Sequence, residues 1–285
     1  MSKLKIAVQK SGRLHDDSMK ILSDIGISID NGKDQLKASA RNFPLEVFYL
    51  RNSDIPQYLK DGVVDAAILG ENLLIEKGAD ILFAERLGFS KCRVSLAIPK
   101  SKKYTSIEDL EGKRIATSYP KTTQDFLDSK GVKANLHIIN GSVEIAPNIG
   151  LADAIVDIVS SGSTLFKNNL KEVEIVMKSE AVLAVSPCIG PDMEALLKRI
   201  QFRMQSVLKG RESKYVLLNT KNENISKIIS ILPGMKSPTI VPLATEGWSS
   251  LHSVINKNQF WEIIDELKAN GAEGILVCPI ENMIL

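Results

Sequence analysis

Residues 153–165 constrain the fold of this chain more than any other stretch. Apolar residues between 154 and 159 predict a short buried strand, which ends at the small polar run 160–164. Leu165 and Phe166 then open a short helix. A strand, a small polar turn and a helix in this order can direct backbone N–H groups and hydroxyls toward an anion. The same pattern fits an ordinary strand-to-helix turn with a serine or threonine N-cap, so both interpretations stand at this point.

The bulk composition excludes several classes of protein. The chain has 285 residues, enough for two or three domains, and its 44% hydrophobic and 25% charged content is typical of a soluble globular protein. A net charge of +2 gives no global field for nucleic acid or a membrane, so any basic chemistry must be local. The three cysteines lie far apart and the three histidines are scattered, which predicts neither a zinc site nor a disulfide framework. With no signal peptide or membrane span in view, we expect a cytoplasmic protein.

Two cations follow the first predicted strand. Residues 4–8 form that strand, and a helix with Asp16 and Asp17 in its first turn begins after a short loop. Lys10 and Arg13 therefore lie where strand meets helix, the edge at which open α/β sheets bind ligands. The alternative is that both are solvated surface cations.

A second stretch, residues 63–73, has the design of the first. Asp65 precedes Gly70 by five positions and Leu73 follows it by three. The same offsets recur at Asp157, Gly162 and Leu165. We predict two similarly built α/β lobes that face each other across a cleft able to hold two ligands.

The remaining chain returns to the first lobe and then changes character. Residues 173–185 are rich in β-formers, and Pro191 starts a long helix to about Lys209, followed by an expected linker over residues 209–212. The last 75 or so residues read β-α-β-β-α-β, the ferredoxin-like plan, with the first of these helices stopping at Pro233-Gly234. The predicted domains are 1–90 with 180–210 (first lobe), 91–179 (second lobe) and 211–285 (a domain for regulation or assembly).

Several motifs together resemble those of one family, ATP phosphoribosyltransferase, over essentially the whole chain. They are Gln9-Lys10-Ser11-Gly12-Arg13-Leu14, Gly70-Glu71-Asn72, Ala116-Thr117-Ser118-Tyr119-Pro120, Asn140-Gly141-Ser142-Val143-Glu144, residues 153–165 and Glu212-Ser213-Lys214-Tyr215. The third domain makes the chain similar to the long form, which needs no separate regulatory subunit. The stretch Gly88-Phe89-Ser90-Lys91-Cys92-Arg93 departs from the family, which often has two glycines between the phenylalanine and Cys-Arg.

The resemblance implies the first step of histidine biosynthesis. In that reaction ATP and phosphoribosyl pyrophosphate (PRPP) give N1-phosphoribosyl-ATP and pyrophosphate, with Mg²⁺. It also implies two periplasmic-binding-like lobes, a C-terminal domain that binds histidine as a feedback inhibitor, and a homo-oligomer in a dimer–hexamer equilibrium. Adenine N1 carries no proton, so catalysis should depend on positioning and electrostatics rather than on a strong base or a nucleophilic side chain.

On this resemblance we assign roles to candidate residues. The 5′-phosphate of PRPP is held by Ser160, Ser161, Gly162, Ser163 and Thr164. Asp157, or Asp153, contacts the ribose hydroxyls or a metal. Phosphates between the substrates bind Lys10 and Arg13, and the cleft is lined by Glu71, Ser118, Tyr119 and Glu144.

In the last domain the resemblance points to a histidine site near Met235, Ser237, Thr239 and Gly274. The alternative is a turn and a strand edge at a subunit contact. Two rival functions remain: a non-enzymatic bilobed solute-binding or sensor protein for a phosphorylated ligand, and a phosphoribosyltransferase that acts on a different nucleobase.

Overall fold

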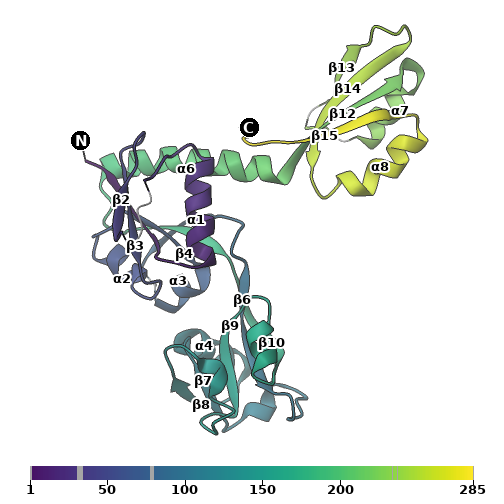
Figure 1. Cartoon of the computed structure of the whole chain (residues 1–285). Coiled ribbons are helices and arrows are strands. Elements are labelled where there is room, and N and C mark those ends of the chain that lie inside the picture. The colour runs from purple at the N-terminus through teal and green to yellow at the C-terminus, as the bar shows by residue number, and fades with distance from the viewer. Residues whose placement is uncertain (1, 31–34, 78–79, 233, 236, 285) are drawn as a thin grey trace. The chain divides into compact units, whose positions relative to one another are not determined.

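The computed structural model describes residues 2–30, 35–77, 80–232, 234–235 and 237–284. Its contacts divide the chain into an N-terminal unit, residues 1–198, and a C-terminal unit, residues 199–285. Three β-sheets form the framework, two in the first unit and one in the second (Figure 1). No helix among the described residues combines the length and apolar character that a membrane span needs.

The first sheet has the strand order β2-β3-β1-β4-β11-β5. Its strands are β1 (Leu4–Gln9), β2 (Lys37–Ser39), β3 (Leu45–Leu50), β4 (Ala66–Gly70), β5 (Leu82–Arg86) and β11 (Ala181–Val185). The parallel strands β3, β1 and β4 lead into α2 (Ile55–Lys60), α1 (Arg13–Asp24) and α3 (Glu71–Lys77). The carboxyl ends of these strands therefore carry the turns to helices, as an open α/β sheet requires.

The second sheet repeats that plan in the order β10-β6-β9-β7-β8. Its strands are β6 (Cys92–Pro99), β7 (Arg114–Thr117), β8 (Asn135–Ile138), β9 (Ala154–Val159) and β10 (Leu170–Ser179). The helical segments are η1 (Ile107–Leu110), α4 (Pro120–Lys130), η2 (Val143–Ile145) and α5 (Ser163–Lys167). Strand β9 has the limits that the apolar pattern predicted.

The two lobes exchange strands. β6 follows β5 along the chain but pairs antiparallel with β9 of the second sheet. β11 follows β10 but pairs antiparallel with β4 of the first sheet. Each sheet thus has three parallel strands followed by an antiparallel strand that arrives from the other lobe. This arrangement confirms the prediction of two similarly built lobes.

The offset that suggested this similarity is wrong in detail. The Asp65 carboxylate accepts the Lys5 backbone N–H at 2.7 Å just before β4. The same contact is made in the second lobe by Asp153, which accepts the Arg114 backbone N–H at 3.0 Å just before β9. Asp157 lies inside β9 and has no such role. The equivalent of Asp65 is therefore Asp153, because β4 leads straight into a helix whereas three loop residues follow β9.

Each lobe buries its own apolar side chains against its sheet. The first core includes Ile55, Leu59 and Leu69, all with no exposed surface. The second includes Ile115 and Val156, at most 1% exposed. Because each lobe has its own core, its internal structure does not depend on packing against the other lobe.

Residues 209–212 are not a linker. The long helix α6 (Pro191–Glu212) continues through them and leads directly into β12 (Ser213–Lys221) (Figure 1). Gly210 has a packing reason to be a glycine: an added Cβ would meet the carbonyl oxygens of Ile280 and Glu281 at 2.7 and 2.8 Å. The chain end is further attached to this helix by the Met283 N–H, which donates to the Ser206 carbonyl at 2.9 Å.

The C-terminal unit has the predicted ferredoxin-like topology. Its antiparallel sheet runs β13-β14-β12-β15, with β13 (Thr239–Pro242), β14 (Trp248–Asn256) and β15 (Glu273–Pro279). The helical segments are η3 (Asn222–Asn224), α7 (Ile225–Ile231) and α8 (Phe260–Ala269). α7 and α8 lie on one side of the sheet (Figure 1) and enclose a core with Val216, Leu218 and Leu251. The predicted helix stop at Pro233 lies outside the described residues.

Glu76 ties the two lobes together beside the strand exchange. Its carboxylate, from α3, accepts the backbone N–H groups of Lys121 and Thr122 at 2.9 and 2.8 Å and the Thr122 hydroxyl at 2.8 Å. These donors lie at the first turn of α4, where N–H groups have no partner within the helix. A carboxylate there also interacts favourably with the helix dipole.

We expect Glu76→Ala to lower the free energy of unfolding of the N-terminal unit by about 1–2 kcal/mol, the usual loss when a helix N-terminus loses its cap. Thermal unfolding followed by calorimetry measures it. Asp125→Ala is the control, since Asp125 lies on the same helix beyond its first turn and pairs with Lys121 at the surface. Equal melting temperatures for wild type and Glu76→Ala would contradict this interpretation.

Candidate active site

A pocket of about 340 Å³ lies between the two lobes of the N-terminal unit. The first lobe contributes the end of β1 and the start of α1, including Gln9 and Arg13. The second contributes Glu144, Asp157 and the whole of residues 160–164. Segments that the sequence singled out separately are thus brought together in one place.

The phosphate-loop candidates, residues 160–164, form a turn that opens toward this pocket. Gly162 has φ +80°, a conformation that side chains disfavour, and an added Cβ would find no atom within 4 Å. Hydroxyls in the turn are ordered locally: Ser161 donates to Ser163 at 3.0 Å. The turn therefore presents small polar groups and an open backbone, as an anion site requires.

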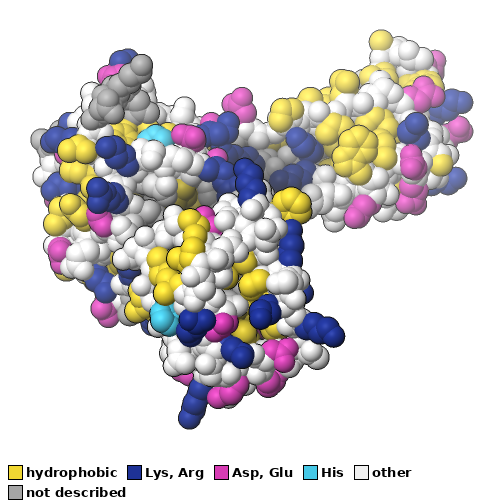
Figure 2. Space-filling model, turned by 60° about the horizontal axis from the view of Figure 1, so that its bottom comes forward, with side chains coloured by type: hydrophobic (Ala, Val, Ile, Leu, Met, Phe, Trp, Pro, Cys, Tyr) yellow, Lys and Arg dark blue, Asp and Glu magenta, His cyan; other side chains and the backbone are white. Residues whose placement is uncertain are grey.

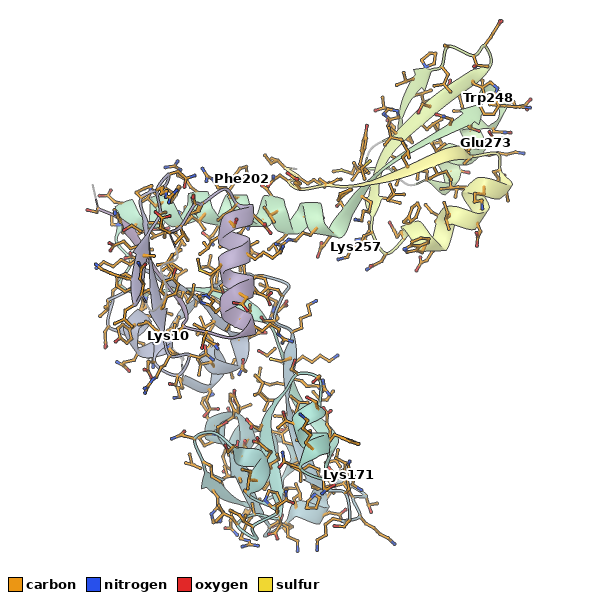
Figure 3. The ribbon with its side chains drawn as sticks, in the orientation of Figure 1. Lys10, Lys171, Phe202, Trp248, Lys257 and Glu273 are labelled. Carbon is orange, nitrogen blue, oxygen red and sulfur yellow. The ribbon has the colours of Figure 1, made fainter. Side chains whose placement is uncertain are left out.

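Arg13 reaches across the pocket to this turn. Its Nη1 donates to the Ser160 hydroxyl at 2.9 Å and its Nη2 to the Lys91 carbonyl at 3.2 Å. Lys10 is exposed at the end of β1 (Figure 3) and does not line the pocket. The structure thus places one of the two predicted cations in the site and the other beside its first-lobe edge.

Asp157 is a pocket-lining carboxylate from β9. It accepts the Ser118 hydroxyl at 3.0 Å and its own neighbour's backbone N–H, that of Ile158, at 2.8 Å. Burial raises the pKa of Asp157, and the nearby Glu144 acts in the same direction. Ser118 lies behind Asp157 and positions it, whereas Glu144 lines the pocket itself.

Tyr119 is held behind the pocket wall. Its hydroxyl accepts from the side-chain amide of buried Asn72 at 2.9 Å, and Asn72 Oδ1 accepts the Ser179 hydroxyl at 2.9 Å. Burial, with the charge of Asp157 as the next cause, raises the pKa of Tyr119, so it stays protonated. Tyr119 therefore contributes to lobe contact rather than to the pocket surface.

Two predicted carboxylates do not line this pocket: Asp153 lies far from it, whereas Glu71 lines a neighbouring pocket that shares Cys92 and Ser160 with it. Asp153, at the opposite end of β9, forms an ion pair with Arg114 at 3.2 Å, and this contact lowers its pKa. Glu71 binds Arg86 at the start of α3, and Arg86 also lies 3.7 Å from Glu180. Both carboxylates are engaged in ion pairs of their own lobe's framework.

Arg93 supports the turn of residues 160–164 by a hydrogen bond to its backbone. Its guanidinium pairs with Glu172 of β10, which also accepts the Ser95 hydroxyl at 2.7 Å. Its Nη1 donates to the Ser160 carbonyl at 3.2 Å. Arg93 thus orients the first residue of the turn.

Several residues that line the pocket were not among the site residues predicted from the sequence. Ser90 and Cys92 come from the crossover between the lobes, and Asn52 from the end of β3. Asn52 Oδ1 is buried without a hydrogen-bond partner among the described residues. Ser90 and Cys92 reach the pocket because the crossover between the lobes passes it, which no local pattern indicates.

The four histidine-site candidates are split between opposite edges of the C-terminal sheet. Met235, Ser237 and Thr239 lie before or at the start of the edge strand β13, and all three are exposed. Gly274 lies in β15, the other edge strand, with φ +56°. Three strand spacings, about 14 Å, separate these edges.

The described residues contain no group of three or more histidine, cysteine, aspartate or glutamate side chains arranged to hold a metal ion. Asp157 and Glu144 are the two pocket carboxylates. One or two carboxylates suit a Mg²⁺ ion that arrives with substrate phosphates, because Mg²⁺ keeps several waters and phosphate oxygens in its shell.

Family models match two adjoining parts of the chain. One described as ATP phosphoribosyltransferase covers residues 51–206, and one described as the HisG C-terminal domain covers residues 210–282. Similar proteins named ATP phosphoribosyltransferase occur in Parabacteroides distasonis (54% identity), Phocaeicola vulgatus (53%) and Cytophaga hutchinsonii (51%). Each match spans 99% of this chain and 98–100% of the relative.

Solved structures give the same relationship. A chain of the Thermotoga maritima ATP phosphoribosyl transferase (HisG:HisZ) complex matches with 30% identity and a TM-score of 0.59, over 71% of this chain and 98% of that one. The substrate-binding protein of an amino acid ABC transporter matches at 15% identity with a TM-score of 0.50, over 72% of this chain and 92% of that one, a likeness of fold alone. The chain belongs to the ATP phosphoribosyltransferase family.

Proposed function

We propose that this protein joins N1 of ATP to C1 of PRPP, giving N1-(5-phosphoribosyl)-ATP and pyrophosphate, the first step of histidine biosynthesis. The observation that carries the proposal is the pocket in which Arg13 meets the hydroxyl turn 160–164 beside Asp157. A hydroxyl turn with an open glycine suits the 5′-phosphate, and a carboxylate suits ribose hydroxyls, which donate. Family membership across nearly the whole chain supports the assignment.

The chemistry needs few groups from the protein. The N1 lone pair forms the new bond to C1 while the C1–oxygen bond breaks, and pyrophosphate leaves with that electron pair; the amino group of adenine then loses a proton. Arg13, with Lys10 at the pocket edge, would neutralise the charge on the leaving group. Among the described residues the pocket has neither a histidine nor a serine–histidine pair, consistent with catalysis by positioning.

Mg²⁺ would supply further charge neutralisation on the pyrophosphate of PRPP. Asp157 and Glu144 are the residues that would hold it together with phosphate oxygens. Asp157 could hold Mg²⁺ with one carboxylate oxygen and still accept a hydrogen bond from a ribose hydroxyl with the other.

The rival function is a solute-binding or sensor protein with the same two lobes. The likeness to a transporter's binding protein concerns the fold alone, whereas the family matches favour the transferase. We also propose a cytoplasmic location and a homo-oligomer that interconverts between dimer and hexamer. Hydrophobic side chains gathered on the surface of the C-terminal unit (Figure 2) support a contact between copies there.

The direct test follows absorbance near 290 nm with ATP, PRPP and Mg²⁺, with pyrophosphatase added to draw the reaction forward. We expect a rise that depends on both substrates and that histidine suppresses. A rise insensitive to histidine would leave the transferase and refute the regulatory role. Folded protein that gives no rise but binds a phosphorylated ligand would favour the solute-binding alternative.

Asp157→Asn should weaken PRPP binding. A hydrogen bond to a charged group contributes about 1.5–3 kcal/mol, so the Kd should rise roughly 10- to 100-fold by calorimetry. Because its pKa is raised, wild-type Asp157 takes up its proton at a higher pH than an ordinary aspartate. The affinity of wild type for PRPP should therefore fall on acidification from above the usual aspartate range, and the variant should lack that component.

Asp153→Asn is the matched control, since it makes the same change at the other end of β9. It should leave the PRPP Kd unchanged, although it weakens the ion pair with Arg114. If Asp153→Asn weakened binding and Asp157→Asn did not, the ribose contact would belong to Asp153 instead.

For histidine we propose a site shared between copies of the chain. A single histidine cannot span the sheet from Thr239 to Gly274 within one subunit, so both sets can contribute only if the β13 edge of one copy approaches the β15 edge of another.

Thr239→Trp should then raise the histidine concentration for half inhibition by about tenfold or more, since a bulky group fills the site and removes a hydroxyl. Activity without histidine should stay as in wild type. Thr245→Trp, in the loop that follows β13, is the control. Unchanged inhibition in Thr239→Trp would remove this residue from the site.

A further inference from the structure

Two connections join the lobes. They are hydrogen-bonded to each other where the strands cross between the sheets. The first runs from β5 to β6 through residues 87–91 and the second from β10 to β11. The backbone of Ala181 bridges them: its N–H donates to the Phe89 carbonyl at 3.0 Å, and its carbonyl accepts the Leu87 N–H at 2.9 Å. The first connection therefore has a defined course as it passes the pocket.

Ser90, on that first connection, has a strained backbone. Its φ is +48°, in the left-handed region that favours glycine. Such a conformation persists only where surrounding contacts hold it. The contact here is the Ser90 hydroxyl, which donates to Asp17 Oδ2 of α1 at 2.7 Å. Ser90 also lines the pocket.

The next residue is held by the same helix. The Lys91 carbonyl accepts Arg13 Nη2 at 3.2 Å. Arg13 and Asp17 are four residues apart on α1, so their side chains leave the same face of the helix one turn apart. One face of α1 thus binds two consecutive residues of the connection through one accepted and one donated hydrogen bond.

We propose that Ser90 and Asp17 are positioning residues for Arg13. Together with Arg13 and Lys91 they form a clamp, which fixes the Lys91 carbonyl where it orients the guanidinium. That carbonyl takes one nitrogen, and Ser160 takes another. The remaining N–H donors of the guanidinium are then aimed into the pocket, toward phosphate oxygens. The inference rests on the proposed function, because it concerns the PRPP phosphates.

The strain at Ser90 makes the clamp dependent on its hydroxyl. Without the hydrogen bond to Asp17, the connection can relax toward ordinary backbone angles and carry the Lys91 carbonyl away from Arg13. PRPP should then bind to an arginine that is ordered only at the moment of binding, which weakens affinity.

The experiment measures PRPP Kd by calorimetry, the KM for PRPP, and the melting temperature for a set of variants. Asp17→Ala and Ser90→Ala should each raise the Kd and KM roughly three- to tenfold, the effect of one lost hydrogen bond. The double variant should be no worse than either single one, because both remove the same contact. Asp17→Asn should bind nearly as well as wild type, since its amide oxygen still accepts from Ser90.

Two further variants separate positioning from general stability. Ser90→Gly also lacks the hydroxyl but adopts a φ near +48° without strain, so its connection is not driven to relax; it should melt higher than Ser90→Ala and lose less PRPP affinity. Asp16→Ala removes an exposed acid from the same turn of α1 and should leave the PRPP Kd unchanged.

PRPP binding within twofold of wild type in both Asp17→Ala and Ser90→Ala would overturn the proposal, as would fully additive losses in the double variant or an equal loss in Asp16→Ala. Wild-type protein that binds no PRPP would instead overturn the proposed function, and this inference with it. The two failures are therefore distinguished by the wild-type measurement.

Discussion

The N-terminal unit depends on the exchange of β6 and β11 between its two sheets. Each of these strands pairs antiparallel with the last parallel strand of the opposite lobe, so neither sheet is complete without a strand that arrives from the other. The carboxyl ends of β1 and β9, from which the pocket is built, face each other only because of this exchange. The pocket and the hydrogen bonds between the two connections both lie at this exchange.

Ion pairs concentrate the effective charge in the pocket. Arg114 is engaged by Asp153, Arg93 by Glu172 and Arg86 by Glu71, which helps a chain with a net charge of only +2 to bind polyanions at one place. Among the described residues the hydrogen-bond partners of Arg13 are neutral oxygens, the Ser160 hydroxyl and the Lys91 carbonyl. Its charge is therefore available to a ligand, while the paired arginines act as structural supports.

Much of the fold was predictable because it is local. The limits of β9 follow from an apolar run closed by small polar residues, and the ferredoxin-like order follows from six elements in sequence. The failures are long-range. Gly210 sits in a helix beside backbone about seventy residues further along the chain, so a pattern that resembles a linker is a packing site. The counterpart of Asp65 is Asp153, because equal spacing along a chain does not mean equal position in a strand. For the site, residue types pointed to Arg13 and residues 160–164, but Ser90, Asn52 and the lobe contacts of Glu76 have no local signature.

The attachment of the chain end to α6 has a consequence for how this architecture could arise. Ser206 near the start of the C-terminal unit and Met283 near its finish are joined by a backbone hydrogen bond, and Gly210 admits the tail between them. The unit is thus a closed loop of chain whose entrance and exit lie together, with a core of its own. A segment whose two ends lie together can be gained or lost as one piece with little loop-closure entropy to repay. The C-terminal unit shares no strand with the two sheets of the lobes, so its presence interrupts neither of them.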